Sequence, residues 1–303
     1  MTIVRTLIDG LYSRPQLLLA LTAFFWACNA IAGQLARGEI TPIQHVAIRW
    51  FMVTALMWPF YGRQAMQSLP VLRSHLGVVA GMAVLGFTGF NILFYVASFN
   101  TTAVNIGILQ GSVPVIVVIL AFLMRGTRIT FLQGIGVALT LAGVALVATR
   151  GAPWLVLDIA LNFGDLVMLA ACLSYAAYAV LLQGRPPISG AVFFTFMAII
   201  AAITSIPPLL WEMAVEAPPM PTWKGWLITL FVAIFPAALA QQFFMRGVDL
   251  IGPGRAGIFT NLVPIFASGL AILILGETFA WYHGAALLLV LCGIAIVQRP
   301  AKS

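Results

Sequence analysis

Charged residues are scarce in this sequence: Asp, Glu, Lys and Arg make up 8% of its 303 residues, whereas 62% are hydrophobic. A soluble domain carries about 25% charged and about 45–50% apolar residues. The apolar residues form runs long enough to cross a bilayer as helices, and the segments between them are too short for a separate soluble domain. The sequence therefore predicts an all-α integral membrane protein.

Carboxylates, cysteines and basic clusters are also few. No carboxylate is expected in the middle of the membrane, which argues against proton coupling and against attraction of a cationic substrate. Cys28, Cys172 and Cys292 lie far apart in apolar runs, which suits neither a disulfide framework nor a metal site. The net charge of +7 comes from scattered basic residues without a basic stripe. We therefore expect no metal, no cofactor and no nucleic-acid partner.

Motifs of other membrane proteins are missing as well. The sequence has no HExxH, no paired aspartates within an apolar run and no Ser/His arrangement at helical spacing, so an intramembrane enzyme is not predicted. No ring of charge or carbonyl-filter sequence indicates a channel. The expected protein is not an enzyme.

Ten apolar segments have about the 20 residues that a membrane-spanning helix needs. The first contains Ala30–Ala32, which resembles a signal-peptide cleavage site, but its length predicts a retained span. The ten segments are 16–36, 42–61, 76–98, 102–124, 130–149, 164–183, 189–211, 224–247, 253–275 and 280–298.

Lys and Arg predict the orientation, because cytoplasmic loops retain positive charge. With the N-terminus inside, only Arg37, Arg150 and Lys224 face outward, and Arg49 lies within a span. The residues then facing inward are Arg5, Arg14, Arg63, Arg73, Arg125, Arg128, Arg185, Arg246, Arg255, Arg299 and Lys302. We therefore expect a multi-pass protein of the cell (inner) membrane with both termini cytoplasmic, and hence an even number of spans.

The two halves of the chain repeat one pattern. "NIGILQGSVPVIVV" at 105–118 and "RAGIFTNLVPIFAS" at 255–268 share Gly-Ile and Val-Pro at an offset of 150 residues. The residues of the first half that recur at this offset are Gly107, Pro114, Gly126, Gly134 and Gly143. Each copy has an odd number of spans, so the second enters the membrane from the opposite side. We predict two inverted five-helix repeats, 16–149 and 164–299, around a central cavity, as in secondary transporters.

Pro114 and Pro264 occupy matched positions near the centres of the fourth and ninth spans. Each removes a backbone donor and crowds the preceding turn. Bent backbone at that depth is tolerated against protein or a water-filled cavity. A packing kink explains either proline alone, whereas the matched pair favours a gating or hinge role.

The residues that carry a family resemblance are "FFWACNAIAGQLARG", Arg49, and the long stretch "RAGIFTNLVPIFASGLAILILGETFAWYHGAALLLVLCGIAIV". The stretch "LFYVASFNTTAVNIGILQGSVPVIVVIL" belongs to the same set. Together these segments resemble the drug/metabolite transporter superfamily. The type is the ten-helix EamA kind, and the branch is that of amino-acid exporters, including exporters of aromatic amino acids. Pro264, Gly276 and Glu277 form the most specific motif, and Thr127 replaces the glutamate in the first half. The resemblance implies a monomeric or weakly associating exporter of small metabolites.

Polar and aromatic residues within the spans are the candidate substrate-binding groups. Each has a simpler explanation as a contact with a neighbouring helix or as core filling, but the set favours a neutral chamber lined by amides and rings. At the repeat offset Asn91 corresponds to Gln241, and Gln110 to Thr260. The candidates are Trp26, Asn29, Asn91, Tyr95, Gln110, Tyr175, Tyr178, Gln241, Thr260 and Asn261.

Arg49 and Glu277 are the candidates for a charge role. Arg49 is either a counter-charge for a substrate carboxylate, or a structural residue that pairs with Glu39 or Glu277 or extends to the outer surface. Glu277 is expected to act as an interfacial anchor or to cap the tenth span, and Asp165 to lie at the periphery.

The expected function is export of small metabolites, chiefly amino acids including aromatic and apolar ones, by alternating access and facilitated diffusion. The alternative is a multidrug, cation or other metabolite exporter of the same superfamily, including a proton-coupled one. The expected partners are a small-molecule substrate and the lipid bilayer.

Overall fold

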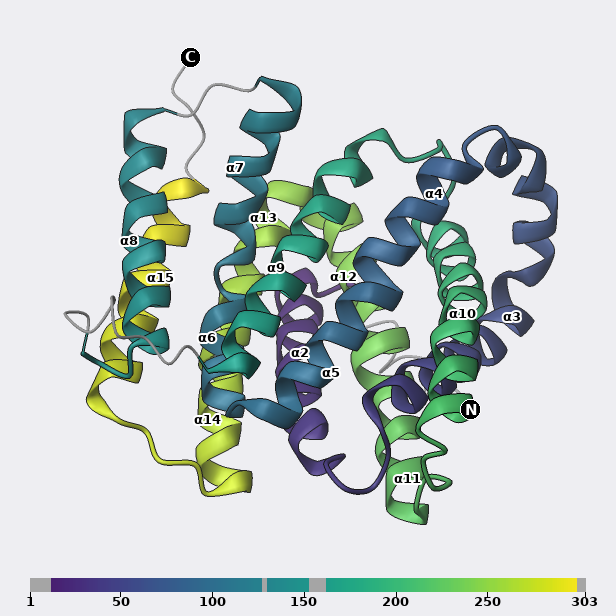
Figure 1. The fold of residues 1–303 in the computed structure, drawn as a ribbon. Coiled ribbons are helices and arrows are strands. Elements are labelled where there is room, and N and C mark those ends of the chain that lie inside the picture. The colour runs from purple at the N-terminus through teal and green to yellow at the C-terminus, as the bar shows by residue number, and fades with distance from the viewer. Residues whose placement is uncertain (1–11, 127–129, 153–161, 299–303) are drawn as a thin grey trace.

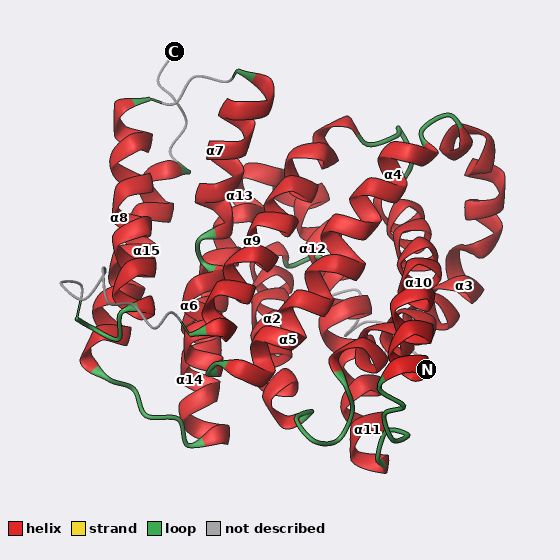
Figure 2. Ribbon diagram, in the orientation of Figure 1, coloured by secondary structure: helices red, strands yellow, loops and turns green. Residues whose placement is uncertain are grey.

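The computed structural model describes residues 12–126, 130–152 and 162–298, and the elements in these ranges are helices, without a strand (Figure 2). Several residues used above lie outside the described ranges. These are Arg5, Thr127, Arg128, Arg299 and Lys302. The last position of the predicted second repeat, 299, is among them.

The helices follow one another along the chain with short connections. Those of the first half are α2 (Pro15–Leu35), α3 (Pro42–Arg73), α4 (Leu76–Ala83), the π-helix η1 (Val84–Gly89), α5 (Phe90–Asn100), α6 (Ala103–Gln110), α7 (Val113–Arg125) and α8 (Phe131–Ala148). Those of the second half are α9 (Phe163–Leu181), η3 (Leu182–Gly184), α10 (Gly190–Val215), α11 (Trp223–Val232), the π-helix η4 (Ala233–Leu239), α12 (Ala240–Ile251), α13 (Pro253–Ile258), η5 (Phe259–Asn261), α14 (Leu262–Leu275) and α15 (Trp281–Val297).

The prediction of a multi-pass, all-helical membrane protein is confirmed. Among the described residues, 8 helices are long and apolar enough to cross a membrane. Two predicted spans do not meet that measure. The helix α15 has 17 residues and is too short. The helix α3 has 32 residues and continues past the predicted end at 61, but it is not apolar enough. The count of ten spans therefore stays a prediction.

Helix ends in this fold follow local sequence signals. Thr41 caps α3 by accepting from the Gln44 amide, with Pro42 in the first helical turn. A threonine at this position satisfies a backbone donor that the helix itself leaves free. Gly126 and Gly276 end α7 and α14 with φ of 66° each, a left-handed conformation that glycine adopts without strain.

The predicted interruptions at both prolines are present. The helix α6 ends at Gln110, and α7 starts again at Val113, so that Pro114 occupies its first turn. The 3₁₀ turn η5 likewise precedes α14, with Pro264 as the third residue of that helix. A proline in a first turn loses no intrahelical hydrogen bond, so both breaks are compatible with the buried backbone.

Several pairs of helices, each with one member from either half of the chain, pack side by side, among them α8 with α15, α3 with α10 and α6 with α14 (Figure 1). In the pair α8 and α15, Gly136 lies against Gly293 and Gly143 against Ala286, so these helices run in opposite directions. The pair α3 and α10 is also antiparallel, because Thr41 at the start of α3 donates to Glu212 near the end of α10, at 2.9 Å.

Candidate functional site

A cavity of about 710 Å³ enters the helix bundle from one end. Its mouth includes the exposed residues Arg185, Ser189 and Asp249, and its inner end reaches the buried rings of Phe87 and Phe194. The walls come from both halves of the chain, namely from α3 and η1 on one side and from α9, α10 and α12 on the other. We refer to this space as the central cavity.

The walls of the central cavity combine rings, neutral polar groups and the charged residues Arg185, Arg246 and Asp249. Tyr178 and Gln241, both predicted, line it. Tyr61 and Gln242 line it as well, with the Tyr61 hydroxyl 3.5 Å from Gln242 Oε1. Tyr61 was missed because it stands at the predicted end of its span, where α3 in fact continues for a further 12 residues to Arg73.

Two other predicted rings stand behind the cavity wall. Trp26 packs against Phe244, a lining residue, with ring centroids 5.4 Å apart. Tyr175 lies 5.3 Å from Tyr178 and 5.0 Å from Phe90. Both rings therefore support the lining side chains instead of facing the space directly.

The predicted residues Asn29, Asn91 and Tyr95 form a buried polar cluster with Arg49. Arg49 Nη1 donates to Asn91 Oδ1 at 2.5 Å and to the Tyr95 hydroxyl at 3.0 Å. The Tyr95 hydroxyl donates onward to Asn29 Oδ1 at 2.7 Å, and Asn91 Nδ2 donates to the Phe87 carbonyl at 2.6 Å. The cluster thus joins α2, α3 and α5 and is tied to the inner end of the central cavity at Phe87.

The predicted pairing of Arg49 with Glu39 or Glu277 is wrong. The Arg49 side chain is only 5% exposed, and its hydrogen bonds go to the neutral groups of Asn91 and Tyr95. It therefore does not extend to the outer surface either. Sequence spacing could not show this, because the choice of partner depends on how α3 packs against α5.

Three further predicted residues lie outside the cavity lining and the polar cluster. Gln110 is the last residue of α6. Thr260 donates to the Gly257 carbonyl of its own segment at 2.7 Å, and Asn261 donates to Gln298 at 3.2 Å. The hydrogen bonds of Thr260 and Asn261 agree with the alternative to substrate binding given above, in which a polar side chain only contacts its own or a neighbouring helix.

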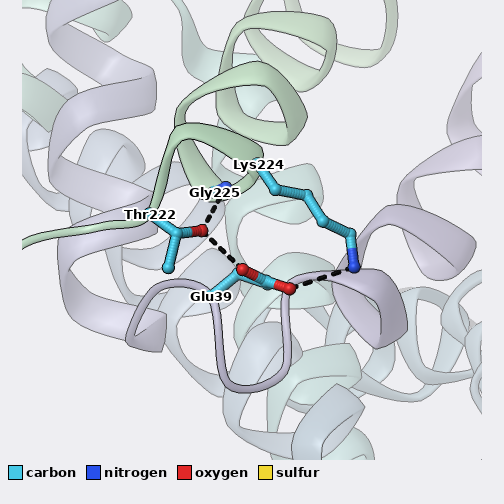
Figure 3. A network of polar contacts seen from close by, with 4 residues as sticks. All are labelled: Glu39, Thr222, Lys224 and Gly225. Carbon is cyan, nitrogen blue, oxygen red and sulfur yellow. Dashed lines mark hydrogen bonds and ion pairs between the residues drawn. The ribbon is translucent and has the colours of Figure 1, made fainter.

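The opposite end of the bundle is closed by polar contacts. Glu39, in the turn after α2, pairs with Lys224 at 3.0 Å and accepts from the Thr222 hydroxyl at 2.5 Å (Figure 3). The Thr222 amide also donates to the Glu39 carbonyl at 2.9 Å. The hydrogen bond from Thr222, and to a smaller extent that from Lys224, holds the pKa of Glu39 below its ordinary value. This carboxylate is therefore ionised at neutral pH. We call these three residues the Glu39 contact.

Other hydrogen bonds strengthen this closed end. Gln44 Nε2 donates to the Pro219 carbonyl at 3.1 Å, and Arg37 Nη2 donates to the Ser98 carbonyl at 3.0 Å. Gln34 donates to the Thr101 carbonyl. Together with the Glu39 contact they join the turn after α2 to the starts of α3 and α11 and to the end of α5.

Glu277 caps a different helix from the one predicted. Its two carboxylate oxygens accept from the amides of Ala103 and Val104, at 2.8 and 3.0 Å, at the start of α6. A carboxylate at a helix N-terminus satisfies free donors and is favoured by the helix dipole. The expected cap on the tenth span is therefore corrected to one on α6.

Asp165 lies near a helix end, as predicted, but it is buried. It is in the first turn of α9 and accepts from the Thr101 hydroxyl at 2.5 Å and from Asn105 Nδ2 at 3.2 Å. Glu212 is also buried, near the end of α10. Neither carboxylate belongs to the central cavity or to the Arg49 cluster.

Both halves of the chain are similar to one family of known proteins. Residues 14–149 and 162–299 each match the EamA-like transporter family. The chain is 28% identical over 225 residues to an uncharacterised transporter of Bacillus subtilis, YetK, covering 73% of this chain and 68% of that protein. It is 26% identical over 304 residues to another uncharacterised transporter of that organism, YwfM, covering 95% and 96%.

A solved crystal structure shares the fold. It superposes with a TM-score of 0.62 and 19% sequence identity, covering 92% of this chain and 94% of that one. The two family matches together span most of the 303 residues, and residues 150–161 separate them. The chain therefore belongs to the EamA-like transporter family.

Proposed function

We propose that this protein is a secondary transporter that exports small metabolites, chiefly amino acids including aromatic and apolar ones, by alternating access. The observation that carries the proposal is the central cavity, which opens at one end of the bundle and stops at Phe87 and Phe194, while the Glu39 contact closes the other end. A carrier that exposes its site to one side at a time has this form in one of its two states.

Inverted repeats of 16–149 and 164–299 are part of the proposal, and several matched features support them. The π-helices Val84–Gly89 and Ala233–Leu239 recur at nearly the repeat offset, as do the left-handed glycines Gly126 and Gly276. The helices α3 and α10, and α8 and α15, correspond at that offset and run antiparallel. Ten spans around one cavity account for these features.

The proposed movement is a rocking of one repeat against the other. The interruptions before Pro114 and Pro264 divide the paired helices of the two repeats into separate segments. Before each proline the α-helical hydrogen bonds give way to tighter i→i−3 turns, as at Ser112 N to Leu109 O and in η5, and such points are where helices bend. These two prolines are therefore the proposed hinges.

We place the mouth of the cavity on the cytoplasmic side. Arg185 and Arg246 line it, and cytoplasmic ends of membrane proteins are enriched in such residues. The same rule favours cytoplasmic termini. We further propose that the protein acts as a monomer in the inner membrane. In this orientation the structure is inward-open, ready to accept a metabolite for export.

The lining supports an amphipathic substrate. The rings of Phe87, Phe194 and Tyr178 suit an apolar or aromatic side chain, and Gln241 offers neutral hydrogen-bonding groups. A proton-coupled or cation exporter is the alternative, favoured by the buried carboxylates of Asp165 and Glu212. Both lie away from the cavity, so we assign facilitated diffusion.

Transport by the purified protein in liposomes tests this proposal. We expect saturable equilibration of labelled L-phenylalanine and L-leucine, because a carrier site is occupied by one substrate at a time. An imposed proton gradient is expected to produce no accumulation. Flux that rises linearly with concentration would indicate a pore, and accumulation that follows the proton gradient would favour the alternative. No flux of either amino acid would remove the proposed substrate class.

A further inference from the structure

We propose that Arg49 is the anion-binding group of this transporter and that it receives the carboxylate of the substrate on the Nε–Nη2 edge of its guanidinium. This inference rests on the proposed function and names the chemical class that the carrier selects. The argument starts from the charge of Arg49, continues with its free donors and ends with its place beside the central cavity.

The positive charge of Arg49 has no negative partner in the part of the chain that the structure describes. The side chain is 5% exposed, and its two acceptors, Asn91 Oδ1 and the Tyr95 hydroxyl, are neutral. The carboxylates that could have neutralised it are engaged elsewhere, Glu39 with Lys224 and Glu277 with the α6 amides. A buried charge without a counter-ion is costly, so its retention calls for a function.

One edge of the guanidinium is left without a hydrogen bond. Nη1 makes both of the hydrogen bonds described above, and Nε is buried without a partner among the described residues. Nε and Nη2 form the planar fork that binds both oxygens of a carboxylate through two parallel hydrogen bonds. The free edge therefore matches a carboxylate better than a spherical anion.

Trp50, the next residue of α3, carries a second buried donor without an acceptor in the described part of the chain. The Arg49 Cζ lies 5.0 Å from the centroid of the Trp50 ring, and Trp50 Nε1 is buried without an acceptor among the described residues. A buried donor without an acceptor is uncommon in folded proteins and is explained by a ligand that supplies the missing oxygen. Two neighbouring residues of α3 thus carry unused donors.

The Trp50 ring connects Arg49 to the inner wall of the central cavity. The Trp50 ring lies 5.0 Å from Phe87 and 6.5 Å from Phe194, and these two rings line the cavity. Phe87 belongs to the π-helix η1, and its carbonyl accepts from Asn91, which is also a partner of Arg49. A movement of η1 would therefore change both the inner wall of the cavity at Phe87 and the Asn91 contact of Arg49.

Ligand-induced thermal stabilisation of the purified protein tests the inference, because a ligand that binds the folded state raises its unfolding temperature. The probes are L-phenylalanine, 3-phenylpropionate, L-phenylalanine amide, phenethylamine and chloride. We expect the two carboxylates to stabilise the wild type and the amide, the amine and chloride not to do so. In R49Q the apparent affinity for the carboxylates is expected to fall by at least about tenfold, as for loss of a bidentate charged pair.

R63Q is the matched control, because Arg63 is an exposed arginine of the same helix α3. It is expected to keep the full response to both carboxylates. If R49Q does not fold, N29D replaces it: the new carboxylate still accepts from the Tyr95 hydroxyl and neutralises Arg49 from within. N29D is expected to fold and to lose the carboxylate response.

The outcomes separate this inference from the proposed function. Equal stabilisation by L-phenylalanine and its amide, or an unchanged response in R49Q or N29D, overturns the role of Arg49 and leaves amino-acid transport untouched. Stabilisation by chloride alone, lost in R49Q, overturns the assignment to a carboxylate. If no probe stabilises the wild type, the inference is wrong, and liposome flux of labelled L-phenylalanine decides the proposed function independently.

Discussion

Oxidation of the double variant E39C/T222C is expected to stop transport. Thr222 donates through its amide to the Glu39 carbonyl at 2.9 Å, and the two side chains meet at 2.5 Å (Figure 3). Backbones this close, with facing side chains, suit a disulfide, whose Cα atoms lie about 4.4–6.8 Å apart. The bond would lock the closed end, and flux is expected to fall by at least about tenfold because alternating access requires that end to open.

The measurement is amino-acid flux in liposomes before and after reduction, in a background with Cys28, Cys172 and Cys292 replaced by alanine. The single variants E39C and T222C are the matched controls and should respond to neither oxidant nor reductant. Loss of the exposed Glu39–Lys224 pair alone is expected to have little effect, since exposed ion pairs contribute only about 0–1 kcal/mol. Full flux through the oxidised double variant would show that this end does not open.

The second large effect is expected from G293A. A Cβ at Gly293 of α15 would lie 2.2 Å from Thr140 Oγ1 and 2.6 Å from the Gly136 carbonyl oxygen of α8. Because one of these atoms is backbone, the two helices would have to separate. Overpacking of this kind costs about 1–3 kcal/mol of unfolding free energy.

Gly269 of α14 provides the control, because a Cβ there meets nothing within 4 Å. G269A is expected to be neutral or slightly stabilising, since alanine favours a helix over glycine by about 0.5–1 kcal/mol. Denaturant unfolding of both variants under one set of conditions compares them. Equal stability of G293A and G269A would contradict the close packing of α8 against α15.

Much of the fold could be predicted from local patterns. The apolar runs gave the positions of the helices, and the matched prolines predicted the breaks before Pro114 and Pro264, because a missing donor acts on its own turn whatever the neighbours do. The π-helices η1 and η4 could not be predicted, since an inserted residue in a helix leaves the average hydropathy of a span unchanged. The extension of α3 to Arg73 was missed for a similar reason, because it continues as a polar helix beyond the apolar run.

The site was predictable in its chemistry but not in its pairing. A polar residue within a span needs a partner, which is why Asn29, Asn91 and Tyr95 stood out. The partner itself depends on interhelical distances that a sequence does not contain. Pairing with Glu39 or Glu277 was one of the alternatives for Arg49, whereas its hydrogen bonds go to neutral groups. For Glu277 the alternatives were an interfacial anchor or a cap on the helix that follows it, whereas it caps α6.

Thiol labelling of S74C and E216C tests the inverted arrangement, the central claim, most directly. These exposed residues are the C-caps of α3 and α10, which correspond in the two proposed repeats. In intact cells a membrane-impermeant maleimide is expected to label E216C, and to label S74C only after permeabilisation. Labelling of both from the same side would contradict inversion and, with it, the proposed carrier.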